Sequence, residues 1–168
     1  KSPIPVILMP PPLAPVIAKT IKREQFSLQE DDFVVLSIFD ANSIIERKNP
    51  YDMIHAFRDA FQTSDDYPNS KMVMKINNLS HYPEHQHRIQ DLMKDINGIL
   101  LTDYLDREVL NGLIDSCDVY ISLHRSEGFG LNIAEMMARK KPVVATNYSG
   151  PEDYLNRSNS YPVGFRMV

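Results

Sequence analysis

Hydrophobic residues along the chain form short continuous runs that alternate with stretches of helical spacing. Apolar runs without polar alternation are typical of strands buried on both faces, and they occur at 33–39, 71–76, 99–102, 119–123, 142–146 and near 161–163. Apolar residues three and four positions apart predict helices over 52–62, 84–96, 106–117 and 130–139, with a short helical turn at 151–155. Such alternation indicates parallel βαβ crossovers. The sequence therefore predicts an α/β fold, a Rossmann-like parallel sheet flanked by helices.

The first 28 residues differ from the remainder. Six prolines fall between Pro3 and Pro15, and the apolar run 6–9 between them predicts one short strand. Proline fixes φ and lacks an N–H donor, so this stretch is expected to be an extended, semi-rigid spacer. We therefore expect two parts, a Pro-rich interdomain segment over 1–28 and a folded domain over 29–168.

Composition narrows the class of protein. A chain of 168 residues is about one domain, and a net charge of −4 argues against nucleic acid as the main partner. The single cysteine, Cys117, excludes an intramolecular disulfide and a CxxC metal site. His85 and His87 lack a carboxylate or cysteine at ligand spacing, so no metal site is expected. With no signal peptide and no apolar run near membrane-spanning length, we expect a cytoplasmic protein, here as a fragment of a longer chain.

Ligands of open parallel sheets bind beyond the carboxyl ends of the strands, and the segment 123–138 lies at such a place. Gly128 and Gly130 allow a tight turn after the fourth core strand, and a helix then begins near Gly130. The unpaired N–H groups of a helix start favour a phosphate. Glu127 and Glu135 flank that start and could accept hydrogen bonds from sugar hydroxyls. An ordinary strand-to-helix turn is the alternative, with Glu135 paired to Arg139 and Glu127 exposed.

Two other loops at the same edge carry candidate groups. Arg47 and Lys48 precede a predicted helix start, with Asn49 as N-cap and Pro50 as first helical residue. Two cations beside a helix start could hold a diphosphate, or they could be solvated loop charges. The segment 147–152 follows the fifth strand and could lend N–H groups or a carboxylate to the same cleft, or form a simple Gly-Pro turn.

These residues carry a resemblance to a known family. The string SEGFGLNIAEMMARKKPVVATNYSGPEDYL resembles the donor-site signature of glycosyltransferase family 4, the group 1 glycosyltransferases, which is an E-x7-E pattern containing FGL. FDANSIIERKNP resembles the phosphate-binding loop of that family, and CDVYISLHRSEG resembles the strand before the signature. The similarity extends from about residue 33 to residue 163.

The resemblance implies the C-terminal, nucleotide-sugar-binding half of a GT-B fold. Glu127 would be the catalytic-site residue that positions the donor sugar, and Glu135 would contact the ribose. The other implied donor-binding residues are those of the phosphate-binding loop, the glycine loop and the loop that meets the base: Arg47, Lys48, Gly128, Phe129, Gly130, Leu131, Tyr104 and Leu105. The implied substrate is a UDP- or GDP-linked sugar, with no cofactor and no metal.

The sequence also departs from the family pattern in two loops. Many members carry an arginine at the end of the first strand, where this chain has 40–43 (DANS), and the nearest arginine is Arg47. After the second strand a glycine-rich turn is common, and here Lys75 or Asn77 is expected to take its place.

The expected function is donor binding in a retaining glycosyltransferase. The full protein would transfer a sugar to an acceptor glycan or lipid bound by an N-terminal domain, in cell-surface polysaccharide or lipopolysaccharide synthesis, in the cytoplasm or at the inner face of the membrane. The isolated fragment would be inactive. Two alternatives are a non-catalytic nucleotide-binding module on the same fold and a glycoside hydrolase that uses Glu127 and Glu135.

Overall fold

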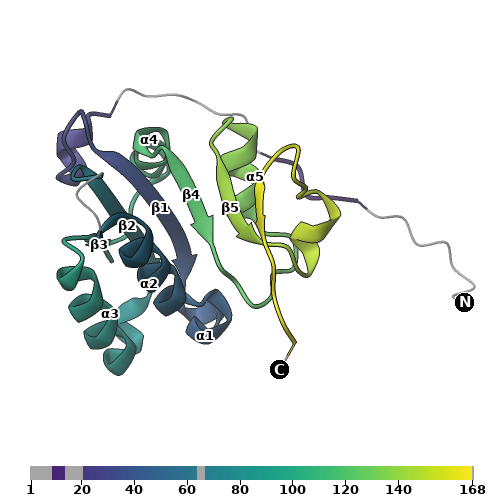
Figure 1. Cartoon of the computed structure of the whole chain (residues 1–168), viewed down its shortest axis with the longest axis horizontal. Coiled ribbons are helices and arrows are strands. Elements are labelled where there is room, and N and C mark those ends of the chain that lie inside the picture. Colours follow the sequence, from purple (N-terminus) through teal and green to yellow (C-terminus); the bar gives the residue numbers. More distant parts are fainter. Residues whose placement is uncertain (1–8, 14–20, 64–66, 168) are drawn as a thin grey trace, which may run out of the picture.

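The computed structural model describes residues 9–13, 21–63 and 67–167. Its centre is a six-stranded sheet in the order β3-β2-β1-β4-β5-β6, in which every neighbouring pair is parallel (Figure 1). The strands are β1 (Phe33–Asp40), β2 (Ser70–Asn77), β3 (Ile99–Leu101), β4 (Val119–Ser122), β5 (Val143–Thr146) and β6 (Tyr161–Val163). The predicted Rossmann-like parallel sheet is confirmed.

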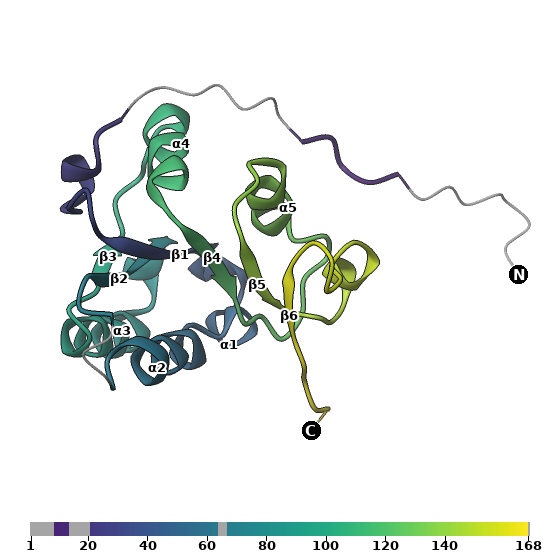
Figure 2. The same ribbon diagram turned by 45° about the horizontal axis from the view of Figure 1, so that its top comes forward.

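Helices cover both faces of this sheet. The α-helices are α1 (Ile45–Lys48), α2 (Pro50–Phe61), α3 (Pro83–Asp95), α4 (Arg107–Ser116) and α5 (Leu131–Ala138). Figure 2 shows α4 and α5 on one side of the sheet and α2 and α3 on the other. Short 3-10 helices lie at Arg23–Phe26, Ala41–Ser43, Leu79–His81 and Gly150–Asp153.

The core has two layers because successive side chains of a strand point to opposite faces. In β1, Leu36 and Ile38 pack toward α4 and α5, whereas Val35 and Phe39 pack toward α2 and α3. β2 repeats the pattern, so both strands are apolar on both faces and read as continuous hydrophobic runs. This double burial is the reason that the strands could be predicted without a period of two.

The predicted elements match the structure closely, with differences at the loops. Residues 40–49, expected to be a loop, form a 3-10 turn and the short helix α1. Asn49 precedes α2 as predicted, but its side chain makes no capping hydrogen bond and its φ is 57°. In the strand predicted over 6–9, residues 6–8 lie outside the described part of the chain, and Met9 belongs to no strand. Among the described residues, no helix is both long and apolar enough to cross a membrane.

The order in which the chain adds strands to the sheet reverses between β1 and β4, which makes this place a topological switch point. The chain runs outward from β1 through β2 to β3, then returns to the other side of β1 and continues through β4, β5 and β6. β1 and β4 pair only at Val35 with Val119 and Leu36 with Tyr120. Beyond that point the carbonyl of Ile38 accepts hydrogen bonds from side chains instead, from Tyr120 Oη at 3.2 Å and Asn132 Nδ2 at 2.8 Å. A crevice at such a switch point is where ligands of this sheet type bind.

Candidate functional site

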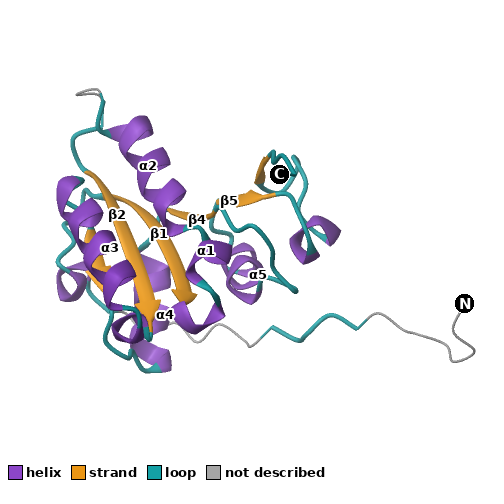
Figure 3. Cartoon of the chain, turned by 90° about the horizontal axis from the view of Figure 1, so that it is seen from below, coloured by secondary structure: helices purple, strands orange, loops and turns teal. Residues whose placement is uncertain are grey.

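A cavity of about 310 Å³ opens at the switch point. Its walls come from the end of β1, the end of β4, helix α1 and the start of α5, with Ile38, Arg47, Lys48, Glu127, Gly130 and Asn132 among the lining residues. In Figure 3 the arrowheads of β1 and β2 point to the edge where α1 lies. The cavity therefore lies at the carboxyl edge, where the sequence placed the candidate loops.

The start of α5 faces this cavity with its backbone N–H groups uncapped. Gly130 is the N-cap residue, has a φ of 78° and offers no side chain to the first turn. A side chain there is disfavoured, since the positive φ suits glycine and a Cβ would lie 2.9 Å from Tyr154 Oη and 3.1 Å from Ile133 Cδ1. Free N–H groups and the positive end of the helix dipole make this helix start favourable for an anion.

The loop before α5 is held in place by the segment after β5. The carbonyl of Glu127 accepts hydrogen bonds from Gly150 N at 3.0 Å and from Ser149 Oγ at 2.8 Å. Tyr154 Oη donates to the carbonyl of Phe129 at 2.6 Å. A Cβ on Gly150 would overlap the carbonyl of Gly128. The segment 147–152 was predicted to supply groups to the cleft or to form a turn. In the structure it supports the glycine loop through hydrogen bonds to the loop backbone.

Arg47, Lys48 and Glu127 come together at the mouth of the cavity. The ammonium of Lys48 is hydrogen bonded to Glu127 Oε1, and Arg47 Nη1 lies 3.4 Å from Glu127 Oε2. The three side chains are 28%, 15% and 14% exposed in chain order. Glu127 is thus mostly buried and ion paired, contrary to the alternative in which it was an exposed residue.

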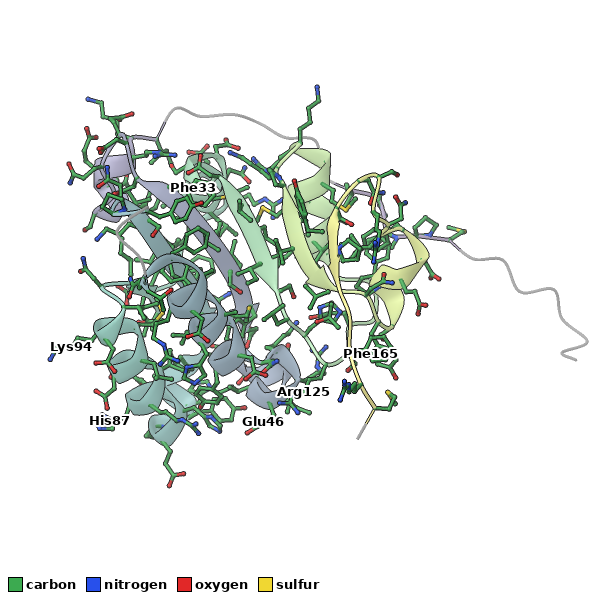
Figure 4. The ribbon with its side chains drawn as sticks, in the orientation of Figure 1. Phe33, Glu46, His87, Lys94, Arg125 and Phe165 are labelled. Carbon is green, nitrogen blue, oxygen red and sulfur yellow. The ribbon has the colours of Figure 1, made fainter. Side chains whose placement is uncertain are left out.

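Further contacts attach helix α1, which carries the two cations, to the loop after β4. Arg47 Nη1 donates to the carbonyl of Ser126 at 2.7 Å, and Arg125 N donates to the carbonyl of Arg47 at 2.8 Å. Asn49 Nδ2 donates to the carbonyl of Leu123 at 2.9 Å, which is the role its side chain takes instead of capping. Arg125 and Glu46, labelled in Figure 4, mark the neighbouring ends of these two segments. The cations are therefore positioned by a network of backbone contacts.

Glu135 of α5 contacts the start of α4, and Tyr104 and Leu105 lie in the loop that leads into that helix. Glu135 Oε1 is 2.9 Å from Arg107 Nη2, at the first residue of α4, so the pairing with Arg139 that the alternative of an ordinary turn required is not observed. Arg139 instead binds Asp115 at 2.7 Å and joins α5 to the far end of α4. Tyr104 is 87% exposed, and the residue after it, Leu105, packs against the core.

Sequence reasoning missed several polar groups around the site. Asn132 follows the signature glycines, and the available signal was an amide at the second residue of the helix that begins there. Tyr120 lies in an apolar strand, where its hydroxyl could not be distinguished from a core position. His124 is buried after β4, accepting from Ser122 Oγ through Nδ1 at 3.1 Å and donating to the carbonyl of Tyr148 from Nε2 at 3.3 Å. Burial lowers the pKa of His124, which fits this neutral form.

The histidine cluster of α3 makes separate contacts. His85 Nδ1 lies 2.6 Å from Tyr51 Oη and His85 Nε2 lies 3.3 Å from Glu46 Oε1. His87 lies 3.4 Å from Asp91. Within residues 9–13, 21–63 and 67–167, no three His, Cys, Asp or Glu side chains are grouped so that they could hold a metal ion.

The family model "Glycosyl transferases group 1" matches residues 18–161. The chain belongs to the group 1 glycosyltransferases. A comparison of its sequence with curated proteins gives no match. The predicted resemblance is confirmed at the level of the family.

Solved structures show the same fold at low identity to this glycosyltransferase domain. A glycosyltransferase from Rickettsia africae aligns with a TM-score of 0.65 at 24% identity, over 84% of this chain and 36% of that one. The C-terminal domain of the group 1 protein LpcC from Francisella tularensis gives 0.65 at 20% identity, over 89% and 77%. Starch Synthase IV from Arabidopsis thaliana, bound to ADP and acarbose, gives 0.63 at 16% identity, over 86% and 30%. The chain spans only 29% to 37% of the first four structures compared. The fold is that of one half of a GT-B glycosyltransferase.

Proposed function

We propose that this domain binds the donor of a retaining glycosyltransferase, a nucleoside diphosphate linked to a sugar, at the switch-point cavity. One observation carries the proposal: two cations, an uncapped helix start and a carboxylate surround a single cavity at the carboxyl edge. Cations and helix N–H groups bind phosphate oxygens, and a carboxylate accepts hydrogen bonds from sugar hydroxyls.

The same groups suit the chemistry of sugar transfer. When the bond between the sugar and the diphosphate breaks, negative charge grows on the diphosphate. Lys48, Arg47 and the N–H groups of Gly130 and Leu131 lie around the same cavity, where they would stabilise that charge. Because this chain supplies the positive charge, we propose that donor binding needs no metal ion and no cofactor. Glu127 then positions the donor sugar.

We propose that the nucleoside lies on the α4 side of the diphosphate. Glu135, held by Arg107, would bind the ribose hydroxyls, and Tyr104 and Leu105 would meet the base. In Starch Synthase IV this fold was solved with ADP, so the fold alone does not choose the base and side chains must do so. UDP- and GDP-linked sugars are the donors proposed for this chain.

The acceptor, a glycan or a lipid, would bind through a second, N-terminal domain of the full protein. We place the full protein in cell-surface polysaccharide or lipopolysaccharide synthesis, in the cytoplasm or at the inner face of the membrane. Since the acceptor half completes the active site, this domain alone should bind donor and not transfer sugar.

Calorimetric titration with UDP, GDP, ADP and their sugar conjugates tests the proposal. We expect saturable binding of one diphosphate, weakened roughly tenfold or more by Lys48→Ala and by Glu135→Ala, because each substitution removes a hydrogen bond to or from a charged group. Lys94→Ala, a substitution on α3 far from the cavity (Figure 4), should leave affinity unchanged. Loss of affinity in the Lys94 variant equal to that of Lys48→Ala would contradict the proposal.

The sugar conjugates separate the alternatives. A conjugate that binds more tightly than its diphosphate supports a donor site. Binding without any sugar preference favours a non-catalytic nucleotide-binding module. Hydrolysis of an aryl glycoside in the absence of nucleotide favours a glycoside hydrolase. In the structure Glu127 pairs with Lys48 and Glu135 pairs with Arg107, and no observation favours the hydrolase.

A further inference from the structure

Lys75 of β2 is a buried cation with one hydrogen-bond partner within the described part of the chain. Its residue exposure is 2%, and its ammonium is hydrogen bonded to Asn77 Oδ1. Among the described residues no carboxylate lies within ion-pair distance of Lys75. Burial lowers the pKa of Lys75, and the more distant charges of Asp103 and Asp40 counteract that effect. A lysine is rarely buried without a paired carboxylate, so its two remaining N–H donors call for an explanation.

The position of Lys75 brings its ammonium to the carboxyl edge of the sheet. Residues two apart in a strand share a face, so Lys75 and Asn77 point the same way, and the hydrogen bond shows that the lysine side chain runs toward the strand end. Asn77 is the last residue of β2 and is half-buried. The Lys75 ammonium therefore lies directly beneath a side chain that reaches the surface of this edge.

Cross-strand pairing places Lys75 between the cavity and the loop that follows β3. Its neighbour in β1 is Ile38, which lines the cavity. Its neighbour in β3 is Leu101, three residues before Tyr104. Lys75 also shares the α4 side of the sheet with Ile38 and Leu101, the side on which Glu135 and Arg107 meet. A nucleoside that extended from a diphosphate in the cavity toward Tyr104 would therefore pass over the end of β2, where Lys75 and Asn77 lie.

We propose that Lys75, with Asn77, is a specificity-determining residue that reads the base of the donor by donating to a carbonyl oxygen. This inference rests on the proposed donor site. A lysine ammonium only donates hydrogen bonds. Uracil and guanine present carbonyl oxygens, whereas adenine presents an amino donor at the corresponding position. The buried ammonium is thus matched to a uracil or guanine edge and is unfavourable beside the adenine amino group. The Nδ2 group of Asn77, whose Oδ1 accepts from Lys75, would be a second donor toward the base.

The test is calorimetric titration of this chain with UDP, GDP, ADP and pyrophosphate, in wild type, Lys75→Met and Lys71→Met. Methionine has a similar length and suits a buried position. Lys71 lies on the same face of β2 near its opposite end and is the matched control. The wild type should bind UDP or GDP at least about tenfold more tightly than ADP, because a hydrogen bond to a charged group is exchanged for an unfavourable contact. Lys75→Met should lose most of that preference and keep its pyrophosphate affinity, and Lys71→Met should keep both.

The possible outcomes separate a failure of the proposed role of Lys75 from a failure of the proposed donor site. A wild type that binds ADP as tightly as the better bound of UDP and GDP overturns the inference, and this result does not depend on how any variant folds. A Lys75→Met variant that retains the base preference also overturns it. A Lys75→Met variant that loses pyrophosphate and nucleotide affinity alike, with a lower melting temperature, shows a structural role only and overturns it as well. A wild type that binds no pyrophosphate and no nucleotide instead contradicts the proposed donor site, so the two failures are distinguishable.

Discussion

Replacing Glu127 by glutamine should strengthen the binding of a bare diphosphate. In the structure the Glu127 carboxylate lies against both Lys48 and Arg47, so it occupies the place where a phosphate oxygen would bind. With Glu127 charged, these three groups carry a net charge of +1, and Glu127→Gln raises it to +2. An incoming anion then no longer has to displace a carboxylate from the two cations.

The magnitude follows from the burial of the three side chains. Two unit charges about 4 Å apart interact with an energy of at most roughly 4 kcal/mol at an effective dielectric of about 20. Arg47, Lys48 and Glu127 are 28%, 15% and 14% exposed. Their ion pairs are therefore intermediate between an exposed pair, which is worth about 0–1 kcal/mol, and a buried pair, whose breaking costs about 3–5 kcal/mol. We therefore expect pyrophosphate to bind about tenfold more tightly, which is about 1.4 kcal/mol. The variant itself should lose about 1–3 kcal/mol of stability, a fall in melting temperature of roughly 2–12 °C at about 2–4 °C per kcal/mol.

Calorimetry with pyrophosphate and with a nucleotide sugar measures both sides of this prediction. Glu127→Gln should gain more affinity for pyrophosphate than for the nucleotide sugar, since the carboxylate that we propose binds the sugar hydroxyls is gone. Glu46→Gln removes the same charge from α1, where the carboxylate is 63% exposed and contacts His85, so it should change affinity little. If Glu127→Gln leaves pyrophosphate affinity unchanged or weaker, the reasoning that Glu127 occupies the anion site is refuted.

Three further predictions concern the supporting structure. Gly150→Ala should destabilise the domain by about 1–3 kcal/mol, because its Cβ would overlap the carbonyl of Gly128, whereas Gly164→Ala, with open space around it, should melt like the wild type; equal melting temperatures for the two would contradict this. Burial raises the pKa of Cys117 to about 11, so a thiol reagent at pH 8 should react only after unfolding; fast labelling of the native protein would show otherwise. Since burial lowers the pKa of His124 below its unfolded value of about 6.5, the unfolded state takes up the proton first and stability falls as pH drops below about 6.5. His124→Gln should show a shallower decline of melting temperature from pH 6.5 to 5 than the wild type, and a decline of the same steepness would refute the assignment.

Much of the fold could be predicted because the hydrophobic pattern is strong. The strands around Val35 and Val73 are apolar on both faces, and the helices between them carry regular apolar spacing. The glycine loop and the cations before Pro50 were also found, since a helix start after a strand is visible as a local pattern.

The features of the site that the sequence did not predict depend on contacts between residues far apart in the chain. The pairing of Glu135 with Arg107 spans 28 positions, and local spacing favoured Arg139. The pairing of Glu127 with Lys48 spans 79 positions and turns two separately predicted groups into one site. The supporting role of Gly150 arises only where its backbone meets Gly128 in space.

The helix α1 was missed for a local reason. It has only four residues, too few to show a helical period, and it follows Ile44 at a φ of 65°. A β-branched residue is rarely found with a positive φ, so propensity gave no indication of that turn.

Chemical-shift mapping of the backbone amides, on the domain saturated with its tightest nucleoside diphosphate, tests the central claim most directly. A donor site at the switch point predicts the largest shifts at the first turn of α5, from Gly130 to Asn132, and at Arg47 and Lys48. Shifts concentrated instead beyond the ends of β4 and β6, around Arg125 and Phe165 (Figure 4), would contradict it and place the nucleotide in another cavity.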